Sequence, residues 1–489
     1  MTDLILVLDA GTTSTRAMAF DRTGAVRAVT QRELTQHYPR PGWVEHDAQE
    51  IWEATLACAR ETVAQRGGSS AFAGIGITNQ RETVVAWDKR SGEPLARAIV
   101  WQDRRTSEFC DVLRREGHEA EVQRRTGLLL DPYFSATKMR WLLDNAGEVA
   151  AAANAGTLAL GTIESWLVWK LTGGAHLSDA SNASRTLLLA LDGAQFDAGL
   201  CELFGVPRAA LPEVVDCAGE FGVTAPGLFD AALPIRGLAG DQQAATVGQG
   251  CLHPGEVKST YGTGAFVLAN MGEALPHSRH RLLGTVLTQL GGKRTYALEG
   301  SVFVAGSLIK WLRDSLGVIA SAAETAALAA SVDDTGGVVL VPALSGLGAP
   351  HWRPEARAAL TGMSFATTRA HLARAALEAT ANQTRDLMEA FAADGAPWAS
   401  LRIDGGMSAN DWLAQDLADM LEVPVERPAM VETTALGAAM LAAVASGWFA
   451  DLDEAARAMR GKVRRFVPSL ADEVRAARLE AWRAALANV

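Results

Sequence analysis

The feature that most constrains the fold of this chain is a short apolar run near its N-terminus that ends in an acid and a glycine. Leu4–Leu8 precedes Asp9-Ala10-Gly11, and β-rich stretches follow at 17–20 and 25–30. Lys258–Asn270, with the sequence KSTYGTGAFVLAN, has the same order of strand, Thr/Gly turn and strand. The two patterns predict two related domains that each contain this motif.

Strand-like and helix-like segments alternate after the first pattern. A helix is predicted from about residue 48 to residue 65, and a buried strand over Ala73–Thr78. Arg369–Phe391 is predicted to be an amphipathic helix that carries Glu378 on its polar face. The alternation predicts an α/β architecture.

Length and composition allow two large domains. The chain has 489 residues, of which 48% are hydrophobic, and this is enough apolar material for two buried cores. We place the domains at 1–248 and 249–489, because a new pattern begins near Cys251–Gly255. No long linker separates them, so they are expected to share an interface at which a ligand cleft forms.

Charge and cysteine usage exclude several classes of protein. The net charge is −11 and no Lys/Arg run is present, which argues against a nucleic-acid partner. Five dispersed cysteines without a CxxC pair predict reduced thiols and a cytoplasmic location. The N-terminus does not have the pattern of a signal peptide. Thr433–Ala450 has no charge but is rich in small residues, which predicts a closely packed buried helix and no membrane span.

Common phosphate-binding and hydrolase motifs are missing. The chain has no GxxxxGK[ST], no GxGxxG after a strand, no HExxH and no GxSxG. If the chain handles phosphate, it must therefore do so on another scaffold.

The first turn offers a different way to hold phosphate. Thr12, Thr13 and Ser14 bring three hydroxyls and three backbone N–H donors, and Arg16 adds a guanidinium. Asp9, at the end of the strand, could hold Mg²⁺ through its water shell. The alternative is an ordinary polar hairpin.

Three further polar groups follow predicted strands. Arg81 and Glu82 are suited to grip a polyhydroxy ligand, with a buried structural ion pair as the alternative. Trp101 could pack on a carbon chain, although a core tryptophan is the commoner case. Asp241 and Gln242 precede a helix of small residues and resemble a positioned base with a substrate contact, with an N-capping aspartate as the alternative.

Two Gly-rich turns, at 261–264 and 404–410, complete an ordered set of motifs. The set resembles the FGGY family of carbohydrate kinases over nearly the whole chain, and within it the glycerol kinases. The strings that carry the resemblance are ITNQRET at 77–83, PGWVEHD at 41–47, DPYFSATK at 131–138, SNASRT at 181–186, GDQQAA at 240–245 and GLGAPHW at 346–352.

The resemblance implies a fold of two actin-like, ribonuclease H-like domains that flank a deep cleft. The N-terminal domain would hold the polyol and phosphate groups, and the C-terminal domain the nucleotide. The implied polyol-binding residues are Arg81, Glu82, Trp101, Tyr133, Asp241, Gln242 and Phe266. The implied nucleotide-binding residues are Thr12, Thr13, Ser14, Arg16, Thr263, Gly306, Lys310, Gly406 and Asn410. Asp241 would be the general base, and Asp9 and Asp241 would lie at the Mg²⁺.

The implied activity is ATP-dependent phosphorylation of glycerol to sn-glycerol 3-phosphate with Mg²⁺. A kinase for another small polyol or ketose is the first alternative, and the aromatic residues Trp101, Tyr133 and Phe266 favour the three-carbon substrate. A non-catalytic actin-like nucleotide-binding protein is the second, and the presence of Asp9 and Asp241 argues against it. A homo-oligomer, either a dimer or a tetramer, is compatible with this assignment.

Some positions depart from the family pattern. Ala10 and Lys310 stand where Gln is usual, and Glu164 stands where Asp is usual. Some bacterial relatives bind fructose 1,6-bisphosphate through a Gly-rich loop ending in Arg. The corresponding segment here, Thr224–Arg236, has one Gly, two Pro and Asp230, and Arg236 is its only cation. We therefore expect no inhibition by this bisphosphate.

Overall fold

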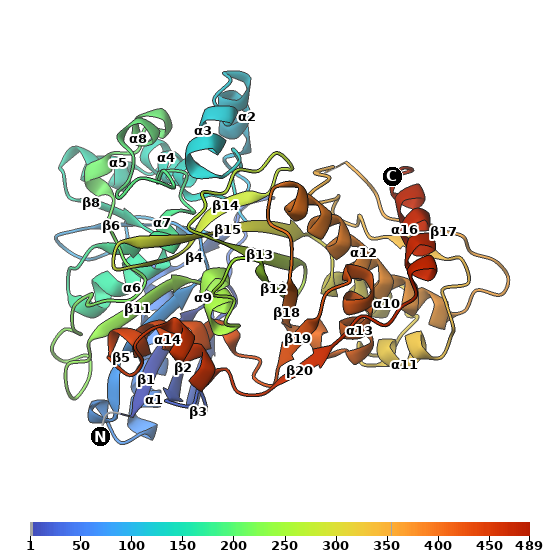
Figure 1. Ribbon diagram of the computed structural model, residues 1–489. Coiled ribbons are helices and arrows are strands. Elements are labelled where there is room, and N and C mark those ends of the chain that lie inside the picture. The colour runs from blue at the N-terminus through green and yellow to red at the C-terminus, as the bar shows by residue number, and fades with distance from the viewer. Residues whose placement is uncertain (1–2, 354) are drawn as a thin grey trace.

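The computed structural model describes residues 3–353 and 355–489, which form two α/β halves placed side by side (Figure 1). The first half is built on a five-stranded sheet in the order β11-β5-β1-β2-β3. Its strands are β1 (Leu4–Ala10), β2 (Ser14–Asp21), β3 (Val26–Glu33), β5 (Phe72–Asn79) and β11 (Ile235–Gly240). β1, β5 and β11 run parallel, while β2 and β3 return as antiparallel strands. The predicted strand, turn and strand opening is confirmed.

The second half contains a seven-stranded sheet in the order β14-β15-β13-β12-β18-β19-β20. Its strands are β12 (Glu256–Tyr261), β13 (Ala265–Gly272), β14 (Leu283–Leu290), β15 (Lys293–Val302), β18 (Ser400–Asp404), β19 (Val425–Pro428) and β20 (Val463–Phe466). β12 and β13 pair antiparallel and β12 pairs with β18 in parallel, which repeats the arrangement around β1. The internal repeat predicted from the sequence is confirmed.

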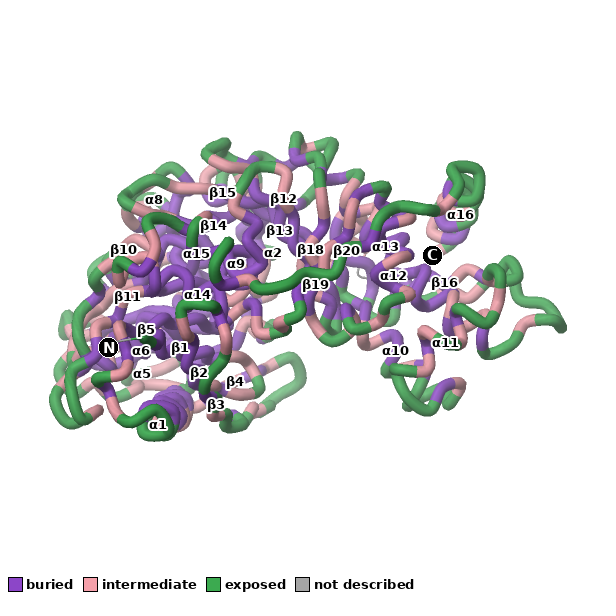
Figure 2. The backbone as a smooth tube through the Cα atoms, turned by 60° about the horizontal axis from the view of Figure 1, so that its bottom comes forward, coloured by how far each residue is buried: buried purple, intermediate pink, exposed green. Residues whose placement is uncertain are grey.

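β1 is buried along its whole length because helices cover both faces of its sheet (Figure 2). Leu4, Leu6 and Leu8 point to one face and pack in a cluster with side chains of α1 (Ala48–Gln65) and α6 (Ile163–Thr172). Ile5 and Val7 point to the other face, toward α9 (Asp241–Gly248) and α14 (Thr433–Ala445). The period of two along a strand thus turns one continuous apolar run into two core faces.

α14 belongs to the second half of the chain but packs on the sheet of the first half. A Cβ added to Gly437 would lie 1.8 Å from the Ala244 carbonyl oxygen of α9, and one added to Gly248 would lie 1.9 Å from the Thr433 carbonyl oxygen. The two helices cross this closely only because glycine occupies both contact positions. The predicted burial of this small-residue helix is confirmed. Within the described residues no helix has the length and apolarity to cross a membrane.

Two further helices match the predicted ranges. α1 covers Ala48–Gln65, and α12 covers Arg369–Ala393. The expectation that Glu378 lies on a polar outer face of α12 is wrong, because Glu378 is only 9% exposed and pairs with Arg374 and Arg478. The helix is covered on that side by α16 (Asp472–Leu486), which supplies Arg478.

The remaining elements connect and cover the two sheets. The other helices are α2 (Ser107–Arg115), α3 (Glu119–Thr126), α4 (Ser135–Asn145), α5 (Gly147–Asn154), α7 (Ala180–Ala183), α8 (Ala198–Phe204), α10 (Gly306–Asp314), α11 (Glu324–Ala330), α13 (Asp411–Leu421) and α15 (Leu452–Met459). The short strands are β4 (Glu45–His46), β6 (Val85–Asp88), β7 (Ala98–Ile99), β8 (Leu158–Gly161), β9 (Leu177–Asp179), β10 (Glu213–Val215), β16 (Val339–Val341) and β17 (Ala359–Thr361).

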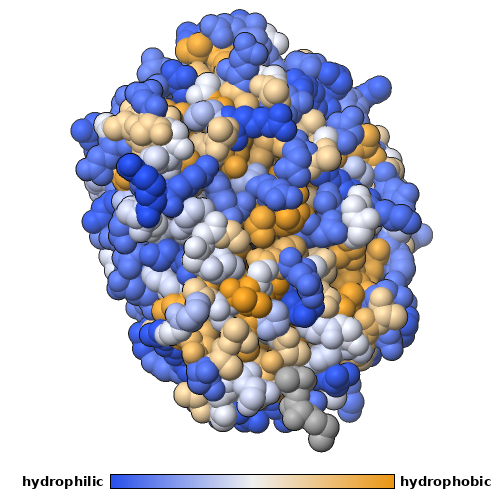
Figure 3. Space-filling view, turned by 90° about the vertical axis from the view of Figure 1, so that its left-hand side faces the viewer, coloured by the Kyte–Doolittle hydropathy of each residue, from blue (hydrophilic) through white to orange (hydrophobic). Residues whose placement is uncertain are grey.

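The cysteines are reduced, as their dispersed positions in the sequence predict. On the face shown in Figure 3, apolar side chains are interspersed with hydrophilic ones. All five cysteines are buried and unpaired, and burial is the main cause that raises the pKa of Cys58, Cys110, Cys201 and Cys251.

Candidate active site

Three parallel strand ends bring the predicted polar residues together. The register pairs Ala10 with Asn79, and Asn79 with Gly240, so β1, β5 and β11 end at the same level. Asp9 lies at the first of these ends, Arg81 is the second residue after β5, and Asp241 directly follows β11. Carboxyl ends of parallel strands form one edge of a sheet, where α/β proteins bind ligands.

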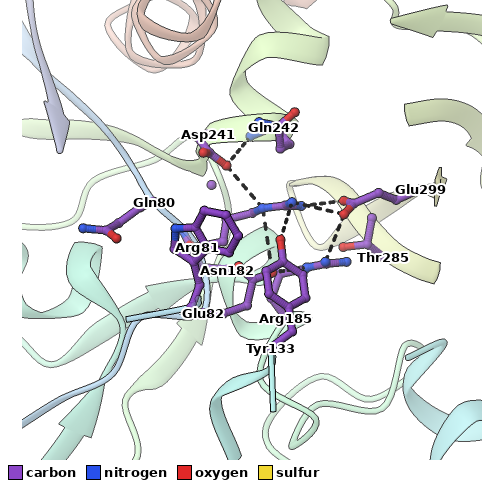
Figure 4. A network of polar contacts seen from close by, with 12 residues as sticks. Gln80, Arg81, Glu82, Tyr133, Asn182, Arg185, Asp241, Gln242, Thr285 and Glu299 are labelled. Carbon is purple, nitrogen blue, oxygen red and sulfur yellow. Dashed lines mark hydrogen bonds and ion pairs between the residues drawn. The ribbon is translucent and has the colours of Figure 1, made fainter. Parts of the chain in front are cut away.

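Arg81 lies at the centre of a buried network of charges (Figure 4). Its NH1 donates to Glu299 Oε2 at 2.6 Å, and its NH2 donates to Glu299 Oε1 at 3.2 Å. Its Nε lies 3.2 Å from Asp241 Oδ1, and its NH2 donates to the Tyr133 hydroxyl at 3.4 Å. Arg185 joins the network through Nε, which donates to Glu82 Oε1 at 2.7 Å, and through NH2, which donates to Glu299 Oε1 at 3.1 Å.

Arg81 and Glu82 were predicted from the sequence, but the main partners of both were not. The Nε of Arg81 and Oε1 of Glu82 are 3.9 Å apart, whereas each makes a closer contact with Glu299 or Arg185. Arg185 lies in the SNASRT string, which marked the segment as similar to the family, but the string by itself gave Arg185 no role. The ALEG stretch around Glu299 gave no such signal because a lone acid inside a strand is not a motif.

The network sets the charge state of its members. Burial alone would raise the pKa of Glu299, but Arg185 and Arg81 lower it to about 2. Desolvation raises the pKa of Asp241 against the opposing effect of Arg81 and Lys258. Asp241 is also accessible, with 34% of its side chain exposed, whereas Glu299 is fully buried. A carboxylate that can reach a ligand and hold a proton is what a general base requires.

Glu82 has a strained backbone. Its φ of 61° lies in the left-handed region, which is uncommon for a residue with a Cβ. The side chain is 1% exposed and is directed at Arg185. Strain of this kind is characteristic of residues held in place at functional sites.

The aromatic residues come from both halves of the chain, Trp101 and Tyr133 from the first and Phe266 from the second. The Trp101 and Tyr133 rings make an edge contact with centroids 5.6 Å apart. Trp101 Nε1 donates to Thr12 Oγ1 at 3.0 Å, which connects the predicted polyol residues to the predicted phosphate turn. Phe266 pairs with Ser301 across β13 and β15, and therefore shares a sheet face with Glu299 two residues away.

Asp241 is the first residue of α9 and not its N-cap. The cap is Gly240, and Asp241 Oδ1 accepts from the neighbouring Gln242 N–H at 2.7 Å. The N-capping alternative is therefore wrong. Gln242 Oε1 accepts from Lys258 Nζ at 2.5 Å, and Lys258 is a second buried charge that the sequence analysis missed.

A buried polar layer fixes the start of α9. The Gly240 N–H donates to Ser181 Oγ at 3.0 Å, and Ser181 in turn donates to Asp179. Glu164, one of the departures from the family pattern, lies in the same layer and accepts from Asn79 Nδ2 at 3.1 Å. Burial and the neighbouring Asp179 raise the pKa of Glu164 to about 7.

The first turn presents its polar groups next to this network. The Gly11 N–H donates to the Ser14 carbonyl at 3.0 Å, while Thr13 is exposed and Thr12 and Ser14 are half-buried. Arg16 bridges two carboxylates, with 2.6 Å from NH2 to Asp9 Oδ2 and 2.6 Å from NH1 to Glu432 Oε2. The guanidinium is therefore fixed in place beside the turn.

Asp9 and Asp241 have the donor chemistry that a magnesium ion prefers. Both are carboxylates whose pKa is raised by burial, and the Asp9 charge adds to the raised pKa of Asp241. A cation between them would relieve this repulsion. No cluster of three or more His, Cys, Asp or Glu side chains suited to a metal exists within residues 3–353 and 355–489. The pair therefore fits an ion that keeps most of its waters.

A glycine at the start of α10 contacts the glycine-rich turn between β12 and β13. The Gly306 N–H donates to the Gly262 carbonyl at 2.9 Å, and a Cβ on Gly306 would lie 2.4 Å from that oxygen. The Thr263 carbonyl accepts from the Ser307 N–H at 3.1 Å. The predicted residues Thr263 and Gly306 thus lie together at the start of α10. Lys310 is exposed farther along the same helix.

Gly406 and Asn410 follow β18. Gly406 is the first residue of the short 3₁₀ turn Gly406–Ala409. The preceding Gly405 has a φ of 84°, and a Cβ there would lie 2.5 Å from the Tyr261 carbonyl oxygen, so both its backbone and its surroundings require glycine. Asn410 is the N-cap of α13, where its Oδ1 accepts from the Leu413 N–H at 3.1 Å. It thus caps a helix, and its nucleotide-binding role stays a prediction.

Comparison with known families decides the identity of the fold. The N-terminal domain of the FGGY family of carbohydrate kinases matches residues 4–248, and the C-terminal domain of the same family matches residues 257–446. The chain belongs to the FGGY family of carbohydrate kinases. This FGGY kinase is 53% identical over 485 residues to a glycerol kinase of Rhodospirillum centenum, with 99% of this chain and 97% of the relative covered. It is 55% identical over 491 residues to a glycerol kinase of Xanthobacter autotrophicus, with 99% of each covered.

A solved structure shows the same two-domain fold. The glycerol kinase of Plasmodium falciparum, in a structure with ADP, superposes with a TM-score of 0.95 at 34% identity, covering 100% of this chain and 98% of that one. The predicted actin-like, ribonuclease H-like fold of this FGGY kinase is confirmed. The domain boundary at residue 248 stays a prediction, because α14 returns to pack on the first sheet.

Proposed function

We propose that this chain transfers the γ-phosphoryl group of ATP to a terminal hydroxyl of glycerol and releases sn-glycerol 3-phosphate and ADP. The proposal is supported by the family, by the identity to glycerol kinases over nearly the full chain, and by the polar network around Arg81. Phosphoryl transfer depends mostly on positioning and on stabilisation of charge, which fixed buried side chains supply.

Each predicted residue receives a role in this reaction. Asp241 accepts the proton of the attacking hydroxyl and orients its oxygen. Arg81, Glu82, Tyr133 and Gln242 bind the hydroxyls of glycerol, while Trp101 and Phe266 pack against its carbons. The nucleotide-binding residues are Thr12, Thr13, Ser14, Arg16, Thr263, Gly306, Lys310, Gly406 and Asn410.

Asp9 and Asp241 would hold a hydrated Mg²⁺. When bound, the ion neutralises charge on the phosphates, which a protein with a net charge of −11 does not do through its overall field. Arg16 contributes a second positive group at this turn, because Asp9 and Glu432 fix its position.

The contact between Arg81 and Asp241 carries the proposal. Its 3.2 Å distance places an accessible carboxylate next to a guanidinium that is 2% exposed, so the candidate base borders the candidate polyol pocket. The accessible carboxylate can therefore meet a hydroxyl of a polyol that is bound beside Arg81.

The test is an ADP-release assay with ATP, Mg²⁺ and a panel of glycerol, dihydroxyacetone, erythritol, xylulose and ribulose. Glycerol should give the highest kcat/KM. Activity that is higher with a ketopentose would reassign the substrate, and ATP binding without turnover on any member would favour the non-catalytic alternative. The predictions of a homo-oligomer and of a cytoplasmic location stay predictions, and sedimentation at several protein concentrations tests the first.

A further inference from the structure

Two fully buried charges of the second half face the candidate polyol pocket of the first half. The register pairs Lys258 of β12 with Leu268 of β13, and Leu268 with Glu299 of β15. Residues paired across neighbouring strands point to the same face of a sheet. Lys258 and Glu299 therefore lie in one row across three strands, on the face that meets Arg81 and Gln242.

Glu299 holds Arg81 across the boundary between the halves. Its two oxygens accept from both terminal nitrogens of Arg81, at 2.6 and 3.2 Å, and Oε1 also accepts from Arg185 at 3.1 Å. The side chains of Arg185 and Glu299 are 0% exposed and that of Arg81 is 2% exposed. Two buried guanidiniums thus share one carboxylate from the other half of the molecule.

Lys258 holds Gln242 in a similar way. Its ammonium donates to Gln242 Oε1 at 2.5 Å and to Thr260 Oγ1 at 2.8 Å. With its oxygen occupied, the Gln242 amide presents its NH₂ group as a donor in the pocket. Lys258 also lies close enough to Asp241 to lower the pKa of that carboxyl.

We propose that Glu299 and Lys258 are positioning residues that complete the polyol pocket from the nucleotide side. The inference rests on the proposed function. Arg81 and Gln242 would have their binding geometry only while the two sheets are together, because each is held by a charge that comes from the second half. Separation of the halves would remove Glu299 from Arg81 and Arg185, so that two buried guanidiniums would lose the carboxylate that they share. Loss of one partner of a buried ion pair is strongly unfavourable.

Glu299 and Lys258 contact Arg81 and Gln242 directly in this structure. Glycerol affinity would therefore depend on two residues that belong to the half of the chain predicted to bind the nucleotide.

The test compares Glu299→Gln, Glu299→Asp and Lys258→Met with the parent protein. Glu299→Gln keeps the shape but loses the charge, so glycerol KM should rise by about 10-fold or more while ATP KM changes less than about 2-fold. Glu299→Asp restores the charge and should recover part of the loss. Lys258→Met should also raise glycerol KM, because Gln242 loses the donor that orients it.

A control separates positioning from general stability. Asp416→Asn weakens another largely buried ion pair, with 2.5 Å between Asp416 Oδ1 and Arg478 NH1, away from the candidate site. It should lower the melting temperature and leave glycerol KM unchanged. Calorimetric titration of each variant with glycerol, with and without a non-hydrolysable ATP analogue, gives a readout that does not need turnover.

The outcomes separate the inference from the proposed function. A parent protein that phosphorylates glycerol, with Glu299→Gln raising glycerol KM and Glu299→Asp recovering it, supports the inference. Equal changes in the KM of both substrates, or changes that only follow the melting temperature as in Asp416→Asn, would overturn it and leave the proposed function standing. A parent protein that phosphorylates no polyol would overturn both.

Discussion

The Nε of Arg81 lies 3.2 Å from Oδ1 of Asp241, although 160 positions separate the two residues in the sequence. The contact joins the second residue after β5 to the first residue after β11. It sets a fixed positive charge next to the candidate base. The residue proposed to bind the polyol thus touches the residue proposed to accept the proton of its hydroxyl.

Replacement of the base should abolish most of the chemistry. Asp241→Asn keeps the volume but removes the proton acceptor, so kcat should fall by about 10²–10⁴ while ATP binding stays nearly unchanged. Steady-state kinetics and calorimetric titration with an ATP analogue check this. Asp192→Asn, at an exposed position, is the control and should behave as the parent. Near-normal turnover of Asp241→Asn would remove Asp241 from the role.

Glu82→Ala should act on one substrate only. The change leaves the Nε of Arg185 without its carboxylate partner at 2.7 Å, which costs about 1–3 kcal/mol or more for a buried charged group. Glycerol KM should therefore rise strongly and ATP KM little. The opposite pattern would mean that the polyol and nucleotide sides are assigned the wrong way round.

Gly437→Ala should destabilise the fold. The new Cβ would lie 1.8 Å from the Ala244 carbonyl oxygen, so α14 must move away from α9. The overpacking costs about 1–3 kcal/mol, which exceeds the gain of about 0.5–1 kcal/mol from the helix preference of alanine. Urea unfolding measures the effect. Gly147→Ala is the matched control, because Gly147 begins α5 with no neighbour within 4 Å, and it should unfold at the same urea concentration or higher.

Glu164 should make stability depend on pH. Its pKa in the folded state is raised to about 7 by burial and by Asp179, from an ordinary value of 4.5. The folded state therefore holds the proton more tightly than the unfolded chain does, and this contribution to stability is lost as pH rises from about 4.5 to about 7. Glu164→Gln cannot lose a proton, so its free energy of unfolding should fall less over this range. Equal pH dependence in both proteins would contradict the prediction.

Fructose 1,6-bisphosphate should not inhibit at millimolar concentrations. Arg236, the only cation of Thr224–Arg236, donates from NH1 to the Ala445 carbonyl at 2.7 Å and pairs with Glu220 at 3.2 Å. Asp230 accepts from the Ser69 N–H at 3.0 Å and would repel a bisphosphate. Titration of the bisphosphate against activity is the measurement. A saturable loss of activity would show either that this segment binds the ligand or that a second site does.

Local sequence determined much of the fold. An apolar run that ends in Asp9-Ala10-Gly11 specifies a buried strand and a turn, because its side chains alternate between two faces that both need cover. The helix predicted from about residue 48 to residue 65 matches α1, and in the structure Asp47 caps its start. The positions of Asp9, Arg81 and Asp241 followed from the same logic, because each lies at or just after a strand end and parallel strands share an edge.

Only the tertiary structure decided which charges meet. Arg81 and Glu299 are 218 positions apart, and the alternation along β15 shows that Glu299 shares a face with Ser301 but not what covers that face. The same holds for Glu378. The helical period predicts that it lies on the exposed face of α12, but in the structure α16 packs on that face and its Arg478 pairs with Glu378. The period of a strand or helix sorts side chains onto faces. The partner of each face depends on how distant segments pack, and packing sums many weak contacts that no single stretch of sequence contains.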